Sequence, residues 1–359
     1  MEINENKQED EIYVGQYQDD KKQIRHGKGK IYYPNPYKTL KFDGEFKSGK
    51  KEGKGSEYEN GLKTFDGNYT NDKKNGEGKE YNKKGELMFE GKFIDDEKNG
   101  EGKEYIEGIL RFEGNYTNGK RNGQGKEYDE KGKTIFEGNY TNGERNGQGK
   151  EYNDKMKIIY EGQYSNDKKN GKGESFDPEN NKRFRGEFIK GQKNKGIELY
   201  KKIIDNNNYI KYKSEYENGE MKNVVKMWQY KEGKVIFIGE SLNGEKNGNG
   251  KEYDNKGHLL FEGKYINGEK NGNGIEYNPD GKFVGEYING KKWNGKGINK
   301  KGDTLYDIIN GYGTIREYED GNLIYEGGYL NGMRHGEGRE YTKDKIIKVR
   351  YSYGLKFEE

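Results

Sequence analysis

The chain has 359 residues, of which 28% are hydrophobic and 36% are charged. Globular domains usually carry about 45–50% apolar residues, so a thick hydrophobic core is excluded. Lysine plus arginine (67) nearly balances aspartate plus glutamate (64), and the net charge of +3 argues against a dedicated nucleic-acid binder. The absence of cysteine excludes disulfides and thiolate metal sites, and it suits a reducing, cytoplasmic location.

Residues 1–11 are polar and acidic, and we expect them to form a disordered tail. They lack the apolar stretch of a signal peptide, and no apolar run in the chain reaches the roughly 18 residues of a membrane span. The chain contains 57 glycines and no alanine, which disfavours helix almost throughout. Heavy use of asparagine and lysine without alanine is typical of an AT-rich genome such as that of a protist.

From residue 12 to residue 195 the sequence repeats itself. Residues 110–128 read LRFEGNYTNGKRNGQGKEY, and residues 134–152 read TIFEGNYTNGERNGQGKEY. The glycine after each aromatic–acid pair recurs at intervals of mostly 23 or 24 residues, as from Gly114 to Gly138. A short fixed period indicates one small structural unit that is stacked many times.

Each repeat has the pattern of a β-hairpin. Phe136, Gly138 and Tyr140 are two residues apart, so in a strand they share one face. An Asn-Gly pair then predicts a tight turn, because both residues tolerate positive φ. The returning strand carries Gly147 and Gly149, which we expect to leave room for aromatic rings of neighbouring strands. The repeat therefore predicts an all-β protein, a meander of tandem hairpins in one antiparallel sheet.

Residues 196–237 depart from the repeat and are richer in aliphatic side chains. One interpretation is a repeat that has drifted, or a bend between repeats. The other is a patch that binds a partner protein, because apolar side chains on so polar a surface would be unusual if exposed. The candidate partner-binding residues are Val224, Val225, Met227 and Trp228.

Regular repeats resume over residues 238–354, and residues 355–359 form a C-terminal tail. The three histidines, His26, His258 and His335, lie in separate repeats. The sequence shows neither a Ser-His-acid arrangement nor a clustered set of metal ligands. We therefore expect no catalytic residue, no metal site and no cofactor, and we expect that the protein is not an enzyme.

The element FEGNYTNGKRNGQGKEY, present in about a dozen variants, resembles the membrane occupation and recognition nexus (MORN) repeat. The resemblance extends over residues 12–354. It implies an elongated, twisted, single antiparallel sheet of hairpins of about 23–24 residues. It also implies a scaffold role, often at cytoskeletal or membrane-associated structures. Some family members carry a lipid kinase or methyltransferase domain; we expect no such appendage here, so kinase activity is not carried over from the resemblance.

One position departs from the common family pattern. An aromatic residue usually follows the second glycine at a distance of two, but here that place is held by Glu127 or Glu151, and tyrosine comes one residue later. Strict alternation would put Tyr152 on the face opposite Gly149. Either a β-bulge turns this tyrosine back, or the sheet carries aromatic residues on both faces.

Pairs of basic residues follow the predicted hairpin turns. In a stacked meander they would recur along one edge at roughly 10 Å intervals. They would then form either a solvated edge or a basic stripe that docks on anionic phospholipids, phosphoinositides included, or on acidic protein surfaces. Glutamates such as Glu97 and Glu144 interrupt the series. The candidate contact residues are Lys50, Lys51, Lys73, Lys74, Lys120, Arg121, Lys168, Lys169, Lys291 and Lys292.

The favoured function is a non-enzymatic scaffold that binds partner proteins along an extended sheet surface. Cytoskeletal or ciliary assemblies, or the inner face of the plasma membrane, are its expected settings within the cytoplasm. Homodimerisation through an end strand is a further expectation, because open sheet edges invite pairing. The alternative is a peripheral membrane module that binds anionic phospholipids through its lysine-rich turns.

Overall fold

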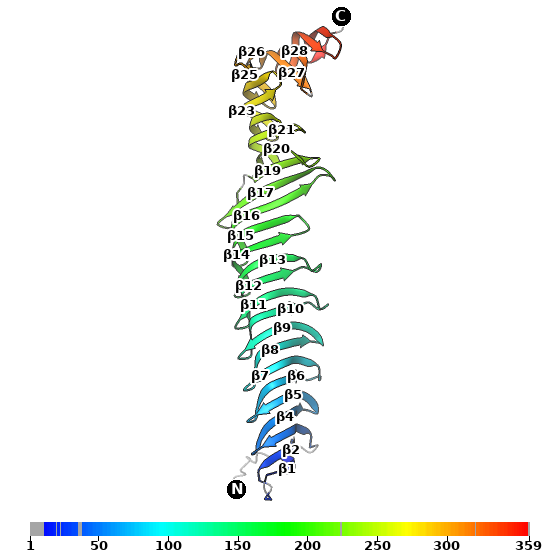
Figure 1. Cartoon of the computed structure of the whole chain (residues 1–359), viewed down its shortest axis with the longest axis vertical. Coiled ribbons are helices and arrows are strands. Elements are labelled where there is room, and N and C mark those ends of the chain that lie inside the picture. The colour runs from blue at the N-terminus through cyan, green and yellow to red at the C-terminus, as the bar shows by residue number, and fades with distance from the viewer. Residues whose placement is uncertain are drawn as a thin grey trace, which may run out of the picture. The chain divides into compact units, whose positions relative to one another are not determined.

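The computed structural model describes residues 11–18, 20–21, 23–34, 38–222, 225–319 and 321–357. Its regular elements are thirty-one β-strands in one antiparallel sheet, and the described residues form no helix. Successive strands lie side by side in chain order and are joined by hairpins (Figure 1). The expected all-β meander is confirmed.

The chain divides into two units, residues 1–176 with 186–193 and residues 177–185 with 194–359. Most of the first unit consists of β1 (Ile12–Tyr17), β2 (Arg25–Tyr32), β3 (Leu40–Lys47), β4 (Lys50–Glu59), β5 (Leu62–Thr70), β6 (Lys73–Tyr81), β7 (Leu87–Ile94), β8 (Glu97–Ile106), β9 (Ile109–Thr117), β10 (Lys120–Tyr128), β11 (Thr134–Thr141), β12 (Glu144–Tyr152), β13 (Ile158–Ser165) and β14 (Lys168–Asp177).

Strand β15 (Lys182–Ile189) has residues in both units. Most of the second unit consists of β16 (Gln192–Ile203), β17 (Tyr209–Glu217), β18 (Glu220–Met221), β19 (Val225–Lys231), β20 (Lys234–Leu242), β21 (Glu245–Tyr253), β22 (Leu259–Ile266), β23 (Glu269–Asn278), β24 (Gly281–Ile288), β25 (Lys291–Asn299), β26 (Thr304–Ile309), β27 (Tyr312–Glu319), β28 (Asn322–Leu330), β29 (Met333–Tyr341), β30 (Ile346–Ser352) and β31 (Leu355–Lys356).

The β11–β12 hairpin shows how one repeat is built. Asn142 and Gly143 have φ angles of 53° and 97°, so both central residues of the turn are left-handed, as a tight hairpin with the natural strand twist requires. Across the hairpin, Gly138 lies opposite Gly149 and Phe136 lies opposite Glu151. The predicted turn is confirmed.

A β-bulge interrupts each regular hairpin at the first glycine of the returning strand. In β12 this residue is Gly147, whose φ is 100°, and the register shifts between Gly138 and Tyr140 on the partner strand. A Cβ at Gly147 would meet Asn139 rather than an aromatic ring. The expectation for Gly147 was therefore wrong, because this glycine is required by its left-handed backbone and not by a nearby ring.

The expectation that Gly149 leaves room for an aromatic ring is confirmed. The ring of Phe136 lies over it, and a Cβ added there would come within 2.5 Å of the ring carbon Cζ. Phe136 is completely buried and packs edge-to-face against Tyr140 and Tyr164, with ring centroids 5.8 Å and 5.2 Å away. Such pairs contribute about 0.5–1.5 kcal/mol each beyond the area they bury. The core is thus a column of rings on one side of the sheet, which we call the ring face.

The opposite side, which we call the groove face, carries the residues that alternate with the ring-face residues. In the β11–β12 hairpin these are Glu137, Asn139, Gln148, Lys150 and Tyr152. The Tyr152 hydroxyl donates a 2.6 Å hydrogen bond to the Glu137 carboxylate, so this tyrosine lies on the groove face. The sequence left open whether a β-bulge turns this tyrosine back or the sheet carries aromatic residues on both faces. The structure shows the second arrangement.

The ring-over-glycine contact predicts a steric penalty for Gly149→Ala. The added methyl would require the buried ring of Phe136 to shift, and overpacking of this kind typically costs about 1–3 kcal/mol. We expect the urea unfolding midpoint to fall and amide hydrogen exchange to accelerate first in β11–β13.

Gly132→Asn is the matched control. Gly132 has a φ of 75° with nothing within 4 Å of an added Cβ, and asparagine tolerates this conformation. Equal loss of stability in both variants would contradict the ring-over-glycine account.

Candidate partner-binding surface

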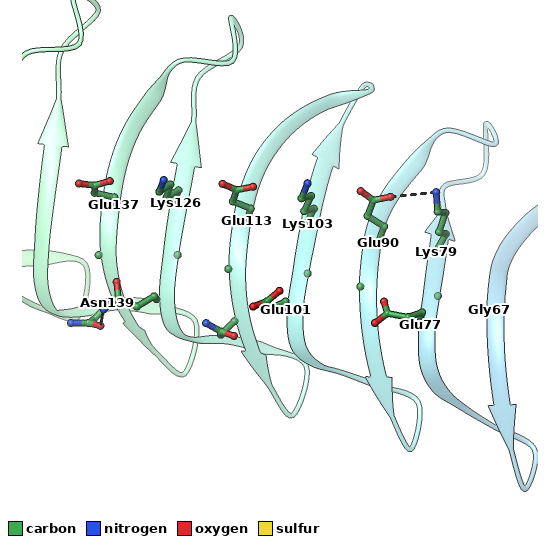
Figure 2. Close-up of a pocket in the computed structure, with 18 of the residues that line it drawn as sticks. Gly67, Glu77, Lys79, Glu90, Glu101, Lys103, Glu113, Lys126, Glu137 and Asn139 are labelled. Atoms are coloured by element: carbon green, nitrogen blue, oxygen red, sulfur yellow. Dashed lines mark hydrogen bonds and ion pairs between the residues drawn. The ribbon is translucent and has the colours of Figure 1, made fainter.

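A groove runs across the strands of the first unit on the groove face, from β4 to β13, with a volume of about 990 Å³. Its floor is the backbone of glycine pairs that face each other across neighbouring strands, such as Gly114 with Gly125 and Gly138 with Gly149. The side chains that flank each glycine form its two walls. Figure 2 shows the walls as two rows with the glycine positions between them.

One wall, the charged row, alternates acidic and basic side chains from strand to strand. The alternation arises because the residue before the marker glycine is acidic, as in Glu137, and the residue opposite it is lysine, as in Lys150. The row consists of Asp66, Lys79, Glu90, Lys103, Glu113, Lys126, Glu137, Lys150 and Glu161.

The other wall, the polar row, is richer in amides. These side chains follow the marker glycine or precede the second glycine of the returning strand. An amide both donates and accepts hydrogen bonds, as the 2.5 Å bond from Gln124 Nε2 to Asn139 Oδ1 illustrates. The polar row consists of Lys54, Asn68, Glu77, Glu101, Asn115, Gln124, Asn139 and Gln148.

The charged row is held by hydrogen bonds and ion pairs. Lys79 Nζ lies 3.3 Å from a Glu90 oxygen, and the Tyr105 hydroxyl donates a 2.7 Å hydrogen bond to the same carboxylate. The hydrogen bond from Tyr105 lowers the pKa of Glu90, because it favours the charged carboxylate. Burial, together with the bond to Glu90, raises the pKa of Tyr105 to about 12. Tyr128 and Tyr152 repeat this arrangement with Glu113 and Glu137.

The groove lining offers charged and hydrogen-bonding side chains along its length. Its titratable side chains are the alternating carboxylates and lysines of the charged row, together with Lys54, Glu77 and Glu101 on the polar row. Among the described residues, no group of three or more histidines or carboxylates is arranged to hold a metal ion. The described part of the chain also has no helix long and apolar enough to cross a membrane.

The basic pairs predicted to form a stripe are split by the structure. The first member of each pair is exposed at the turn, but the second member is half-buried on the ring face. Arg121 places its guanidinium carbon 4.0 Å from the Phe112 ring centroid and forms a 2.5 Å ion pair with Glu104. The half-buried members are Lys51, Lys74, Arg121, Lys169 and Lys292, and the exposed members are Lys50, Lys73, Lys120, Lys168 and Lys291.

Carboxylates share the turn edge with the exposed lysines. Asp96 accepts a 2.8 Å hydrogen bond from the Lys74 backbone amide, and Lys73 forms a 3.7 Å ion pair with Asp95. Asp72 and Asp167 bond in the same way to backbone amides at other turns. The described turn edge of the first unit is therefore mixed in charge rather than uniformly basic.

A ladder of ion pairs runs along the ring face. It joins the second members of the basic pairs, and the equivalent residues of other repeats, to the glutamates that replace the family's aromatic residue. Arg145 lies over the Phe136 ring at 4.1 Å, donates to Glu127 at 2.5 Å and approaches Glu151 at 3.8 Å. Burial acts to raise the pKa of Glu127, but hydrogen bonds from Arg145 and Tyr140 hold it below its ordinary value. The unusual glutamate thus covers the ring column and remains charged.

The candidate patch in the degenerate segment is divided between the two faces. Val224 lies outside the described residues. Val225 and Met227 are 8% and 2% exposed and belong to the ring-face core, so their side chains are not available to a partner. Trp228 points to the groove face, because it lies opposite Lys211 on one side and Ile238 on the other. Strand alternation separates it from its buried neighbours.

Sequence reasoning missed the groove-face neighbours of Trp228. They come from strands on both sides of β19, and the signal that identifies them is cross-strand register rather than proximity in sequence. They include Leu199, Lys201, Tyr209, Lys211, Lys226 and Tyr230.

The ring-face carboxylates predict acid sensitivity. Burial raises the pKa of Glu104, Glu127 and Glu252, but their basic partners outweigh this and lower it below the ordinary value. A carboxyl with a lowered folded-state pKa stabilises the fold above its unfolded-state pKa of about 4.3, and this contribution disappears as the pH falls through the folded-state value. We expect thermal unfolding midpoints to be constant near neutrality and to fall steeply below about pH 4.5.

Glu127→Gln removes one of these titrating groups while keeping the side chain's shape. The unfolding free energy of this variant should depend less on pH between about 5 and 3 than that of the unmodified protein. An unchanged slope would contradict the assignment of acid sensitivity to the ladder.

Comparison with known proteins places this architecture in a family. The sequence profile of the MORN repeat matches ten segments, which together cover more than half of the chain: residues 13–35, 42–63, 65–86, 89–107, 112–134, 136–155, 160–180, 237–258, 261–282 and 325–345. A search of curated proteins found no match. The matched segments coincide with hairpins in which a ring covers a glycine pair, as in β11–β12 and β22–β23. The chain therefore belongs to the MORN repeat family.

Proposed function

We propose that this protein is a non-enzymatic scaffold whose first unit holds a linear segment of a partner protein in the glycine-floored groove. The observation that carries the proposal is the continuity of this groove, which crosses ten successive strands from Lys54 on β4 to Glu161 on β13. Stacked repeats of one hairpin create an extended surface rather than an enclosed pocket.

The dimensions of the groove suit a linear ligand. Nine strand spacings of about 4.8 Å give it a length of roughly 43 Å. An extended segment of about 13 residues would span this length at about 3.3 Å per residue. The β9–β10 and β11–β12 hairpins each offer the same set of groups to the groove: a glycine backbone, a Glu–Lys pair and two amides, as at Gly138, Glu137 and Asn139.

The charges of the groove support a polypeptide over a polyanion. Acidic and basic side chains alternate along the charged row, so no continuous basic track is available for a phosphate backbone. On the opposite wall the exposed carboxylates of Glu77 and Glu101 are accompanied by the exposed lysines Lys54 and Lys92, so this wall is also mixed in charge. The amides and the lysine stems can contact both polar and apolar parts of a peptide. Cytoskeletal or ciliary proteins are the partner class that we favour, and this choice rests on the family resemblance alone.

Filling the groove should abolish peptide binding. The double variant Asn115→Arg/Gln124→Arg places two long side chains over the glycine floor and leaves the ring face untouched. Linear 16-residue peptides would be selected from a random display library on the unmodified protein, and their dissociation constants measured by fluorescence polarisation. We expect at least a tenfold loss of affinity in the double variant.

Lys120→Arg is the control, because this exposed residue lies at the turn edge, outside the groove lining. It should bind the selected peptides within twofold of the unmodified protein. Retained affinity in the double variant, with its circular dichroism spectrum unchanged, would refute binding in the groove.

A further inference from the structure

The groove face of the second unit contains a row in which the acid–base alternation of the repeats breaks down. The row runs across the strands from β16 to β24, and each of its residues lies directly opposite the next one on the neighbouring strand. The row consists of Lys201, Lys211, Trp228, Ile238, Lys251, Glu262, Ile275 and Val284. Only Lys251 and Glu262 keep the usual arrangement, with an ion pair of 2.9 Å.

Basic side chains gather at the start of this row. Lys201 lies directly opposite Lys211, and in the adjacent row Lys213 lies directly opposite Lys226. Like charges in directly opposed positions destabilise a sheet. In the regular repeats the row of Lys201 and Lys211 holds Glu–Lys pairs such as Glu137 and Lys150, and the adjacent row holds amide pairs such as Gln124 and Asn139.

Few carboxylates compensate this charge. Glu215 forms a 3.3 Å ion pair with Lys213. Glu240, which lies opposite Lys226, accepts a 2.9 Å hydrogen bond from the backbone amide of Asn249. Lys211 and Lys226 are exposed, and among the described residues neither forms an ion pair. The cluster therefore has an excess of positive charge that faces solvent.

Aromatic rings form the surface beneath these lysines. Tyr209 and Tyr230 stack with centroids 4.5 Å apart and an interplanar angle of 17°. Lys201 Nζ lies 3.9 Å from the Tyr209 centroid, and Lys211 Nζ lies 5.0 Å from the Tyr230 centroid. Trp228, half-buried, continues this surface between Lys211 and Ile238. We name Lys201, Lys211, Lys213, Lys226, Tyr209, Trp228 and Tyr230 the basic–aromatic patch.

The patch is continuous with a second groove. Ile238, which neighbours Trp228, lines a groove of about 630 Å³ whose wall also includes Ile275 and Val284. The corresponding wall of the first unit is an unbroken charged row. A ligand that covers the patch therefore meets positive charge at one end and apolar side chains at the other.

We propose that the basic–aromatic patch and the adjoining groove bind an acidic polypeptide segment with aliphatic side chains. Its carboxylates pair with Lys211 and Lys226, and its aliphatic side chains pack against Trp228, Ile238 and Ile275. This inference concerns a different surface from the groove of the first unit and does not depend on it.

The surroundings favour such a segment over other anionic ligands. A nucleic acid that followed the groove beyond Ile238 would bring its phosphates to the carboxylate of Glu262 and to the apolar side chain of Ile275. A lipid headgroup would use the lysines but not the recessed apolar wall of the groove. A polypeptide can supply carboxylates and aliphatic groups from one chain.

The spacing of the apolar side chains defines the probe. Ile238 and Ile275 are three strands apart, which is roughly 14 Å, and an extended chain covers this distance in about four residues. The probe is a fluorescein-labelled 12-residue peptide of glutamate and aspartate with two leucines four positions apart. Binding to the full-length protein is measured by fluorescence polarisation at about 0.1 M salt, where charge pairs are only partly screened.

The test variant is Lys211→Glu/Lys226→Glu. Both lysines are exposed. Lys211→Glu places an acid opposite Lys201, and Lys226→Glu places an acid opposite Lys213 on one side and opposite Glu240 on the other. Circular dichroism checks that the double variant keeps the β-fold. We expect at least a tenfold loss of peptide affinity. The matched control Lys120→Glu/Lys168→Glu makes the same charge change at exposed turns of the first unit, and it should stay within twofold of the unmodified protein.

Three outcomes would overturn the proposal: no measurable binding of the peptide, equal loss in the test and control variants, or unchanged affinity in the test variant. Single-stranded oligo-dT and phosphatidylserine vesicles serve as competing ligands. If either binds in a manner that requires Lys211 and Lys226 while the peptide does not, the patch serves another ligand and the proposal fails. A change in tryptophan emission on peptide binding that disappears in Trp228→Phe would locate the peptide at the patch.

Discussion

The packing of one aromatic ring over a pair of glycines is the constraint on which the rest of this structure depends. A single-layer sheet has no second layer against which to bury its apolar side chains. Phe136 solves this problem by lying on the backbone of Gly149 and by packing its edges against tyrosines of the same and the next hairpin. A side chain at Gly149 would displace the ring. The abundance of glycine and the scarcity of aliphatic residues therefore have the same cause, and stability accrues hairpin by hairpin through contacts between neighbours.

The same constraint assigns different roles to the two faces. The ring face is closed by a ladder in which Arg145 lies on Phe136 and bridges Glu127 and Glu151, so its charged groups are largely used within the protein. The groove face keeps an open groove over the glycine backbone, because only the residues that flank each glycine have side chains that project from this face. The charged and amide side chains that line the groove can vary without disturbing the ring column on the other face. Recognition by this scaffold is therefore expected on the groove face.

The irregular segment of the second unit illustrates this independence. Strand β19 keeps Met227 in the ring-face core, yet the neighbouring position presents Trp228 to the groove face beside Lys211. The local fold is preserved while the surface changes from balanced charge to a basic and aromatic character. Two surfaces of different chemistry, the polar groove of the first unit and the basic–aromatic patch of the second, thus arise from the same hairpin geometry. Each of the two surfaces is proposed to hold a partner segment of its own.

The sequence by itself determined the hairpin, its turn and its repetition, because these depend on residues within about 24 positions of one another and on local backbone preferences. Phe136, the left-handed Asn142-Gly143 turn and the ring space at Gly149 were all predictable for this reason. Only the tertiary structure decided which face each side chain occupies. The bulge at Gly147 and the register between strands place Glu151 on the ring face and Tyr152 on the groove face. Register likewise divides the basic pairs between turn edge and ring column, and it separates Trp228 from its buried neighbours. A shift of one residue exchanges the faces of a whole strand, and the cross-strand contacts that set the register join residues whose proximity no short sequence pattern shows.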